Sequence, residues 1–563
     1  MIKRLFAIIL CVLMVVPALA GCSTYDPNED IGETINIYLE NEVYDFDPAF
    51  AYRSKEALQL AELMFSGLFY IDDNGKLQKD LVEKYEIVDE EEQDQYTITF
   101  TLKESYWSDG SLVSAKDFLY AWKRLLDPSF VSDAAVLLYE VRNAFDAKNG
   151  NCSVDDIGVY AINNSTLQIA FDQSIDYEDF LYNLASPCLV ALKESAVDDN
   201  ADWAKRPSTL VCNGPFLLRA VEYGKSLTLE RNTYYLRDRE KDSIKKFVTP
   251  YRLVVDYSKS SADQITAFDN GEISFVGNIA LENRADYKAK ASVYNALSTL
   301  SCYFNIENSI FSDVTVRKAL SDAIDRTAIA EKLIFAEAAT GLVPSGVFEA
   351  KKADKSFRAV GGDYLSKTAN ASGSFSGEFN LAIADNEVHI AVADMLKSAW
   401  EGLGFKVNIV KLGTSATDVV LPEEKAPTKE FVNDDYYAAL VSGEFDVILA
   451  DISALDTDAF SMLAPYAAGY SGRNMTFTVD SYEDAINITG YNSEAYNELI
   501  DKAFAEKNVA KRTSVLHDAE KLLMEDLPVC PIVFTKKAVL ASGIKGVEVD
   551  YFGSVNFNDV KLK

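Results

Sequence analysis

The sequence predicts an α/β fold whose second half contains a parallel, helix-covered sheet. Strands and helices alternate between Cys302 and Ala450, which is the pattern of βαβ units. Hydrophobic residues make up 48% and charged residues 25% of the chain, which are globular proportions. At roughly 150 residues per domain, 563 residues suggest three or four domain-sized units. Open sheets of this kind bind ligands at the carboxyl ends of their strands.

The N-terminus predicts export and a lipid anchor. Lys3 and Arg4 precede an apolar run, Leu5–Leu19, which is short for a membrane span of about 20 residues. The run ends in Leu-Ala-Gly-Cys22, which resembles a bacterial lipobox, a motif whose cysteine receives a diacylglyceryl group. We therefore expect a signal peptide (1–21), lipidation at Cys22 and a polar tether (22–32). The protein is then extracytoplasmic and lipid-anchored to the outer face of the bacterial cell membrane.

The first part of the mature chain predicts short strands and two clear helices. Ile35–Leu39 is a predicted strand, and Ser54–Leu68 carries apolar residues at helical spacing. Ser114–Leu126 is a predicted helix, because Ser114 is followed three residues later by Asp117 in a capping-box pattern. The acidic run Asp89–Asp94 separates two alternating segments and is most simply a solvated hairpin tip.

The second part predicts the alternating α/β unit. The helices expected there are Val314–Ile334, Glu387–Leu403, Tyr436–Ser442 and Asn497–Met524. The strands expected between them are Cys302–Ile306, Phe379–Ala384, Lys406–Val410 and Phe445–Ala450.

Charge and motif content exclude several classes of function. A net charge of −33 argues against nucleic acid and against electrostatic adsorption to an anionic membrane. The only histidines, His389 and His517, lie far apart in the sequence, and each is expected to be a surface or satisfied side chain. No GxSxG, HExxH, GxGxxG or complete P-loop is present. We therefore expect no enzyme, no cofactor and no metal site. Five cysteines follow Cys22, and none of them has CxxC spacing. We expect mostly buried thiols, with one Cys188–Cys212 disulfide as the alternative.

An ordered series of segments resembles one known family. The first block comprises residues 106–110 (YWSDG), 114–118 (SAKDF) and 120–124 (YAWKR). The second comprises 302–305 (CYFN), 316–320 (VRKAL) and 323–326 (AIDR); 213–216 (NGPF), 443–446 (GEFD) and 526–528 (DLP) also match. Together they resemble the oligopeptide- and dipeptide-binding proteins of ABC importers, extracellular solute-binding protein family 5. The series spans nearly all of the mature chain.

The resemblance implies a two-lobed, periplasmic-binding-protein-like fold of the type II or flytrap kind, with an extra inserted domain in the first lobe. The first lobe is expected over 33–299, with its insert at about 55–200, and the second α/β lobe over 300–527. Residues 528–563 return to the first lobe. The chain would thus cross between lobes near Ser298–Leu300 and near Pro528, which makes a hinge.

The resemblance also implies ligand-binding residues. Glu42 is expected near the ligand's N-terminus, with a solvated loop acid as the alternative. Tyr139 and Tyr303 resemble pocket tyrosines, with core packing as the alternative. The family usually has a tryptophan, Ala-Asp-Tyr and Asp-Pro after its Phe-Asp strand, and the tryptophan and Asp-Pro are missing here. Asp451 or Asp456 is expected to bind the ligand's ammonium group, and the choice between them stays open.

The implied function is the solute-binding component of an ABC importer. It would capture short extracellular peptides by hinge closure, as a monomer, and deliver them to permease subunits served by separate ATPase subunits. A sensory role in peptide signalling is indistinguishable from import in the sequence. Two other classes remain: the same fold binding a non-peptide solute, such as an oligosaccharide or a metal chelate, and a secreted hydrolase.

Overall fold

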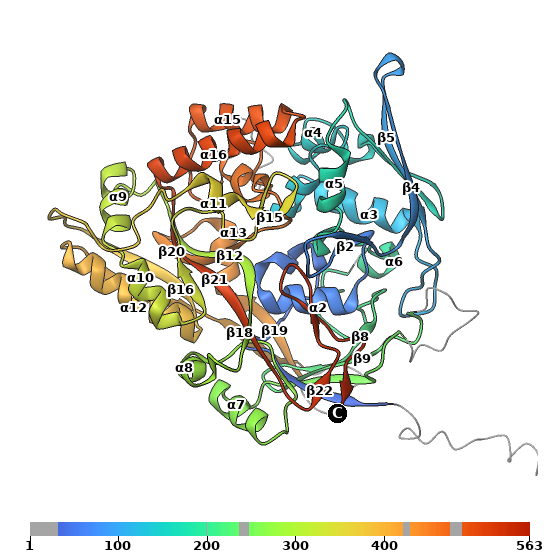
Figure 1. Cartoon of the computed structure of the whole chain (residues 1–563), viewed down its shortest axis with the longest axis horizontal. Helices are drawn as coiled ribbons and strands as arrows, with labels where there is room; N and C mark the ends of the chain where they lie inside the picture. The colour runs from blue at the N-terminus through green and yellow to red at the C-terminus, as the bar shows by residue number, and fades with distance from the viewer. Residues whose placement is uncertain (1–31, 199, 236–246, 420–427, 473–486) are drawn as a thin grey trace, which may run out of the picture.

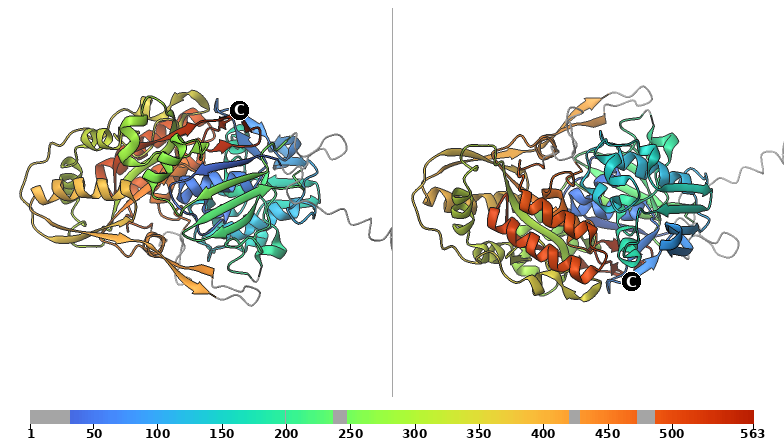
Figure 2. Two further views of the ribbon diagram at one scale, coloured as in Figure 1. Left: turned by 90° about the horizontal axis from the view of Figure 1, so that it is seen from below. Right: turned by 90° about the horizontal axis from the view of Figure 1, so that it is seen from above.

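Two 13-residue strands run side by side through the centre of the molecule and connect its two lobes (Figure 1). The computed structural model describes residues 32–198, 200–235, 247–419, 428–472 and 487–563. Strands β12 (Ser292–Phe304) and β21 (Val529–Ala541) are antiparallel. Their ladder is irregular between Asn295 and Thr299, where the strands pass from one lobe to the other. The expected two-lobed α/β fold is confirmed, and Figure 2 shows the lobes from two sides.

The first lobe is built on the half of the central sheet that contains β1 (Thr34–Tyr38). β1 pairs in parallel with β10 (Arg252–Asp256) and β11 (Phe275–Val276). The antiparallel strands β9 (Ser226–Arg231) and β8 (Phe216–Glu222) complete this edge. Ile35 and Ile37 of β1 are buried in the lobe's core, as the alternating pattern of a half-covered strand predicts.

The second lobe contains the expected parallel unit. Strand β16 (Glu378–Ala384) pairs in parallel with both β17 (Lys406–Leu412) and β20 (Val447–Ser453). The connections contain helices α12 (Glu387–Gly402) and α13 (Asp435–Ser442). All three parallel strands therefore point their carboxyl ends toward the same edge of the sheet.

Two helices expected to be continuous are broken. The Val314–Ile334 segment forms α9 (Val314–Asp322) and α10 (Arg326–Leu333), because Asp325 caps a new helix by accepting from the Ala328 amide. The Asn497–Met524 segment likewise forms α15 (Glu494–Ala505) and α16 (Val509–Asp526), where Asn508 is the new N-cap. Apolar periodicity continues across both breaks, so the pattern alone merges each pair.

The second crossing between lobes lies later than the sequence analysis expected. Val529–Phe534 still pairs with the second-lobe part of β12, and Cys530, Ile532 and Val533 are buried in the second-lobe core. Ala538 and Leu540 instead pack beside Tyr38 of β1. The chain therefore returns near Thr535 rather than near Pro528, because the Leu527–Pro528 turn ends α16 and not the lobe.

The segment expected as an inserted domain forms its own four-stranded antiparallel sheet. Its strand order is β4 (Val82–Glu90), β5 (Gln95–Leu102), β7 (Thr166–Ala170) and β6 (Val159–Asn163). Helix α3 (Ala115–Leu126) packs Phe118 and Trp122 into this core, and its predicted capping box is present. The β4–β5 hairpin projects from the molecule, with the acidic run at its tip (Figure 1).

The remaining helices and strands are short. Those that cover the sheets or connect them are α2 (Lys55–Met64), α4 (Ala144–Lys148), α5 (Tyr177–Asn183), α6 (Glu194–Val197), α7 (Ser261–Asp269), α8 (Arg284–Tyr287), α11 (Phe357–Gly361) and α14 (Phe460–Leu463). The paired minor strands are β2 (Phe69–Ile71) with β3 (Leu77–Lys79), β14 (Phe348–Glu349) with β15 (Lys352–Ser356), β18 (Thr414–Val419) with β19 (Thr428–Asp434), β22 (Ile544–Lys545) with β25 (Lys561–Leu562), β23 (Glu548–Val549) with β24 (Val555–Asn556), and β13 (Ala336–Ala338) with β21.

Three features are absent from the described residues. These residues contain no helix with both the length and the apolarity needed to cross a bilayer. They contain no group of three or more His, Cys, Asp or Glu side chains placed to hold a metal ion. All five of their cysteines are free thiols, so Cys188 and Cys212 do not pair. The predicted signal peptide and the predicted lipidation site Cys22 lie outside the described residues.

Candidate ligand-binding site

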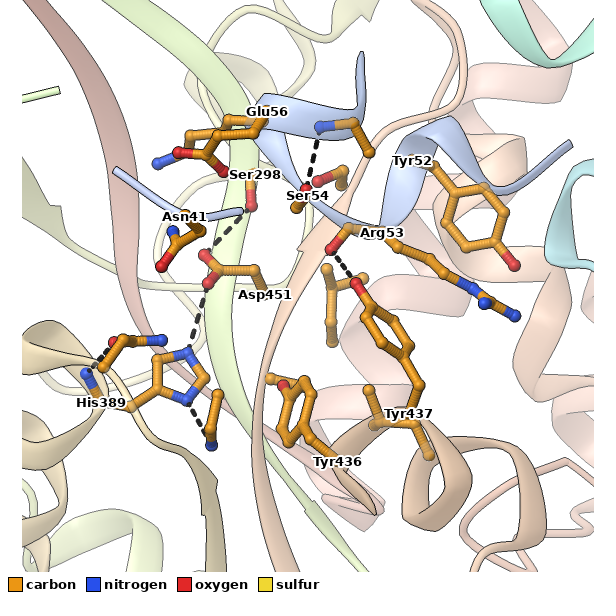
Figure 3. Close-up of a pocket in the computed structure, with 18 of the residues that line it drawn as sticks. Asn41, Tyr52, Arg53, Ser54, Glu56, Ser298, His389, Tyr436, Tyr437 and Asp451 are labelled. Carbon is orange, nitrogen blue, oxygen red and sulfur yellow. Dashed lines mark hydrogen bonds and ion pairs between the residues drawn. The ribbon is translucent and has the colours of Figure 1, made fainter. Parts of the chain in front are cut away.

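A cavity of about 770 Å³ lies between the two lobes. The second lobe contributes the carboxyl ends of β16, β17 and β20 and one face of α13. The first lobe contributes the segment after β1 and the N-terminal turn of α2, and the two connecting strands contribute Ser298 and Thr535 (Figure 3). The site therefore lies where an open α/β sheet is expected to bind its ligand.

The part of the cavity wall that the first lobe supplies is held in place by a partly buried ion pair. A 3-10 turn, Pro48–Arg53, follows Asp47, whose Oδ1 accepts from the Ala49 amide at 3.0 Å. The guanidinium of Arg124, on α3, lies 2.5 Å from Asp47 Oδ2. The Asp-Pro pair thus begins the turn, and α3 fixes the wall that carries Arg53 and Ser54.

Asp451 is an ionised acid that faces the cavity (Figure 3). Its Oδ2 lies 3.5 Å from His389 Nε2, and its Oδ1 lies 3.4 Å from Ser298 Oγ. His389 Nδ1 accepts from the Ala384 amide, so in the neutral ring the proton is on Nε2 and points to Asp451. Burial opposes ionisation of Asp451, but the His389 and Ser298 hydrogen bonds and nearby Lys55 outweigh it, so its pKa is below the ordinary value. The Asp451 side chain is still 36% exposed, so it is open to a ligand.

Acids outnumber bases in the cavity wall. Among the described residues that line it, eight are Asp or Glu and four are Lys or Arg. The acids are Glu40, Glu42, Asp45, Glu56, Asp133, Asp385, Asp434 and Asp451, and the bases are Arg53, Lys55, Arg284 and Lys536. A low-dielectric cavity with this imbalance favours ligands that carry ammonium or guanidinium groups.

Glu42 lines the cavity, but its carboxylate is already bonded to protein groups. Its two oxygens accept from the Gly224 amide at 2.9 and 3.0 Å, and Tyr44 Oη donates to Oε2 at 3.1 Å. Tyr44 Oη in turn accepts from Thr414 Oγ1, in the second lobe, at 3.2 Å. The structure therefore makes Glu42 a support for an interlobe contact at the cavity wall.

The other expected residues divide between cavity and core. Tyr303 lines the cavity, where its ring lies 6.3 Å from that of Tyr466. Tyr139 does not line it: the side chain is buried against Phe145 and Tyr470. Aromatic residues serve both roles equally well, and the sequence carries no signal that separates them.

Asp456 also lies behind the cavity wall rather than in it. It is 3% exposed, and Oδ1 accepts from Ser461 Oγ at 2.6 Å and from the Asp458 amide at 3.0 Å. Burial and the neighbouring Asp458 raise the pKa of Asp456 to about 7. Of the two aspartates left open by the sequence, only Asp451 faces the cavity.

The sequence analysis missed four residues of this site. His389, expected to be a surface or satisfied side chain, is the latter, since it is buried and bonded to Asp451, and it also lines the cavity. Arg53 lies with its guanidinium 3.8 Å from the Phe50 ring and 4.8 Å from the Tyr437 ring. Tyr436 and Tyr437 begin α13, a predicted helix, and Tyr437 Oη donates to the Arg53 carbonyl at 2.7 Å (Figure 3). The available signal for His389 was position, since it follows the carboxyl end of β16 in the parallel unit. Tyr436 and Tyr437 follow β19, a strand of an antiparallel hairpin, so the parallel unit gave no such signal for them.

The lobes also touch beside the cavity. Arg512, on α16, lies 2.7 Å from Asp179 on α5 of the inserted segment and 2.9 Å from Asp458. Asn149 Nδ2 donates to the Gly469 carbonyl at 3.0 Å. These contacts hold the second lobe against the insert while Tyr437 and Thr414 reach the first-lobe wall.

The sequence and the fold were compared with known proteins. The profile of "Bacterial extracellular solute-binding proteins, family 5 Middle" matches residues 76–474. The oligopeptide-binding protein OppA of Bacillus subtilis is 26% identical, over 94% of this chain and 93% of that protein. The dipeptide-binding protein DppE of the same organism is also 26% identical, over 94% of each chain.

Solved structures share the fold. The murein tripeptide binding protein MppA of Escherichia coli aligns with a TM-score of 0.74 at 21% identity, over 94% of this chain and 98% of that chain. The substrate-binding domain of an oligopeptide ABC transporter from Bacillus anthracis aligns with a TM-score of 0.75 at 21% identity, over 94% and 98%. An unliganded open form of MppA aligns with a TM-score of only 0.56 at 22% identity, over 94% and 97%.

Proposed function

The chain belongs to the family 5 bacterial extracellular solute-binding proteins, and on that premise we propose that it captures short peptides for an ABC importer. The peptide-binding names of its relatives support this substrate class. The observation that carries the proposal is Asp451, an ionised carboxylate facing a cavity between two lobes. A peptide's terminal ammonium group is its natural partner.

The binding energy follows from the chemistry of a peptide. Backbone N–H and C=O groups are the same in every sequence, so a cleft that pairs with them accepts many peptides. Each neutral hydrogen bond contributes about 1 kcal/mol, whereas an ammonium–carboxylate bond contributes about 1.5–3 kcal/mol. Asp451 therefore orients the ligand, and contacts to the peptide backbone add affinity without sequence preference.

Capture is a hinge movement with no covalent chemistry. β12 and β21 are the two connections that bend, and closure forms the Tyr437–Arg53 and Thr414–Tyr44 contacts. The poorer match to an open form agrees with a closed arrangement of the lobes in this structure. The ligand then leaves unchanged, to permease subunits served by separate ATPase subunits.

We also propose the cellular setting and the domain division. Residues 1–21 are a signal peptide, and a lipid on Cys22 holds the protein, as a monomer, on the outer face of the cell membrane. The inserted domain spans about 55–200, and no cofactor takes part. The test of the anchor is Cys22→Ala, which is expected to move the protein from the membrane fraction to the medium.

The binding test combines ligand identification with one matched pair of variants. Mass spectrometry of molecules released by denaturing the purified protein is expected to recover mixed short peptides. Asp451→Asn is expected to weaken peptide binding about 10- to 100-fold, which corresponds to 1.5–3 kcal/mol. Asp385→Asn is the control, because Asp385 lines the same cavity but lies 3.4 Å from Lys411. Recovery of sugars only, with no peptide binding, would refute the peptide assignment.

A further inference from the structure

Two further carboxyl groups line the cavity and have no bonded partner among the residues that the structure describes. Glu40 follows β1, and Glu56 lies in the first turn of α2. Glu56 is 6% exposed, and its carboxyl group points into the cavity region shown in Figure 3. Neither carboxyl group makes a hydrogen bond or an ion pair within 4.0 Å to any residue that the structure describes. A buried carboxyl group without a hydrogen-bond or ionic partner is unfavourable, so a ligand group that supplies such a partner is stabilising at this position.

The charged groups around the pair do not supply that partner. Arg284, on α8, donates to the Ile279 and Leu333 carbonyls at 2.9 and 3.0 Å. Glu387, on α12, accepts from the Leu281 amide. Two lysine ammonium groups are also near: Lys55, beside Glu40 and Asp451, and Lys537, beside Glu56 and the buried Asp550.

We propose that Glu40 and Glu56 form a second cation subsite, separate from Asp451, for the ammonium or guanidinium group of a basic side chain in the ligand. The inference rests on the proposed peptide-binding function and specifies the preferred peptides. A terminal ammonium group at Asp451 leaves the Glu40 and Glu56 carboxyl groups without a bonded partner, so a second positive charge on the ligand is their complement. A divalent metal ion is a poor fit, because Ca²⁺ takes six to eight oxygen ligands and Mg²⁺ an octahedral set.

The protonation of Glu40 makes the subsite observable. Burial, and then the charge of Glu56, raise the pKa of Glu40 to about 8, although Arg284 and Lys55 act against them. At pH 7 Glu40 is therefore mostly protonated in the empty cavity. A ligand cation stabilises the carboxylate and displaces that proton, so binding of a basic peptide releases a proton and strengthens as pH rises toward 8.

The test compares two tripeptide series that differ by one charge. In each series lysine or its uncharged analogue norleucine occupies the first, second or third position of a tripeptide that is otherwise alanine. Calorimetry at pH 7 in two buffers of different ionisation enthalpy gives the affinity and the protons released. In the wild-type protein we expect lysine at one position to bind about tenfold more tightly than norleucine, with release of between half and one proton.

The variants assign the effect to the pair. Glu40→Gln is expected to remove most of the lysine preference and the proton release, while norleucine peptides bind as before. Glu56→Gln is expected to reduce the preference, and Glu86→Gln, at an exposed position on β4 outside the cavity lining, to leave it intact. Equal binding of lysine and norleucine peptides, or a preference unchanged in both glutamine variants, would overturn the subsite and leave the proposed function standing. Failure of every peptide to bind would overturn both.

Discussion

Glu40→Gln is expected to stabilise the ligand-free protein, and to do so only at high pH. The raised pKa means that the folded protein keeps the Glu40 proton between pH 4.5 and about 8, whereas the unfolded chain loses it. The native state binds more protons in this window, so its stability falls as pH rises through it. Glutamine resembles the protonated carboxyl group, so the variant does not suffer this loss.

The magnitude follows from the two pKa values. Each pH unit between them corresponds to about 1.4 kcal/mol, so the rise from 4.5 to about 8 amounts to at most about 5 kcal/mol above pH 8. At pH 5 the difference is under about 1 kcal/mol. Stability against unfolding is therefore expected to diverge steadily between wild type and variant over this range.

The assay is urea denaturation of both proteins at pH 5, 7 and 9, after unfolding and refolding to remove bound peptide. Glu86→Gln is the control, because Glu86 is exposed on β4, far from the cavity. A stabilisation of equal size at pH 5 and pH 9 would refute the reasoning, since it would show that the carboxylate is not the destabilising species. If Glu86→Gln also increased stability against unfolding in a pH-dependent way, the effect would come from the overall charge of the protein and not from Glu40.

Three further outcomes are expected. Arg512→Met leaves Asp179 and Asp458 without their buried cation and should lower the free energy of unfolding in urea by about 3–5 kcal/mol. Adding Asp179→Asn should recover part of this loss. A stability equal to that of the wild type would show that these ion pairs do not stabilise the protein. Tyr437→Phe deletes the hydrogen bond to the Arg53 carbonyl, worth about 1 kcal/mol, and should weaken peptide binding about fivefold in calorimetry; unchanged affinity would mean that closure does not need it. The mature polypeptide should show five reactive thiols in denaturant, and a lower count would reveal a disulfide.

Local sequence signals predicted most of the elements because each signal acts over a few residues. The Ser114–Asp117 capping box begins α3, and the alternation after Cys302 predicted the parallel strands and their helices. The broken helices show the limit of such signals. Apolar spacing continues through Asp325 and Asn508, whereas the capping bond that starts the next helix depends on the chain's path.

The candidate site could be predicted only in part, because some of its residues follow from sheet topology and others depend on the path of the folded chain. Residues at strand ends, such as Asp451, could be expected near a ligand from the sheet topology alone. The choice between Asp451 and Asp456 could not, because five residues of sequence separate a cavity wall from a buried interlobe cluster. His389 was expected to be a surface or satisfied side chain, and the aspartate that it contacts in the cavity lies 62 residues away in the sequence.

The sequence by itself determined the family signature, the acidic balance of the chain and the order of its strands and helices, and it predicts an export signal. These properties are read from neighbouring residues or from composition. Only the tertiary structure decided which acids face the cavity, that His389 and Ser298 hold Asp451, and that Glu40 and Glu56 have no bonded partner in the described part of the chain. Such facts depend on contacts between distant segments and on burial, and burial sets the free energy of a charge only after the chain has folded.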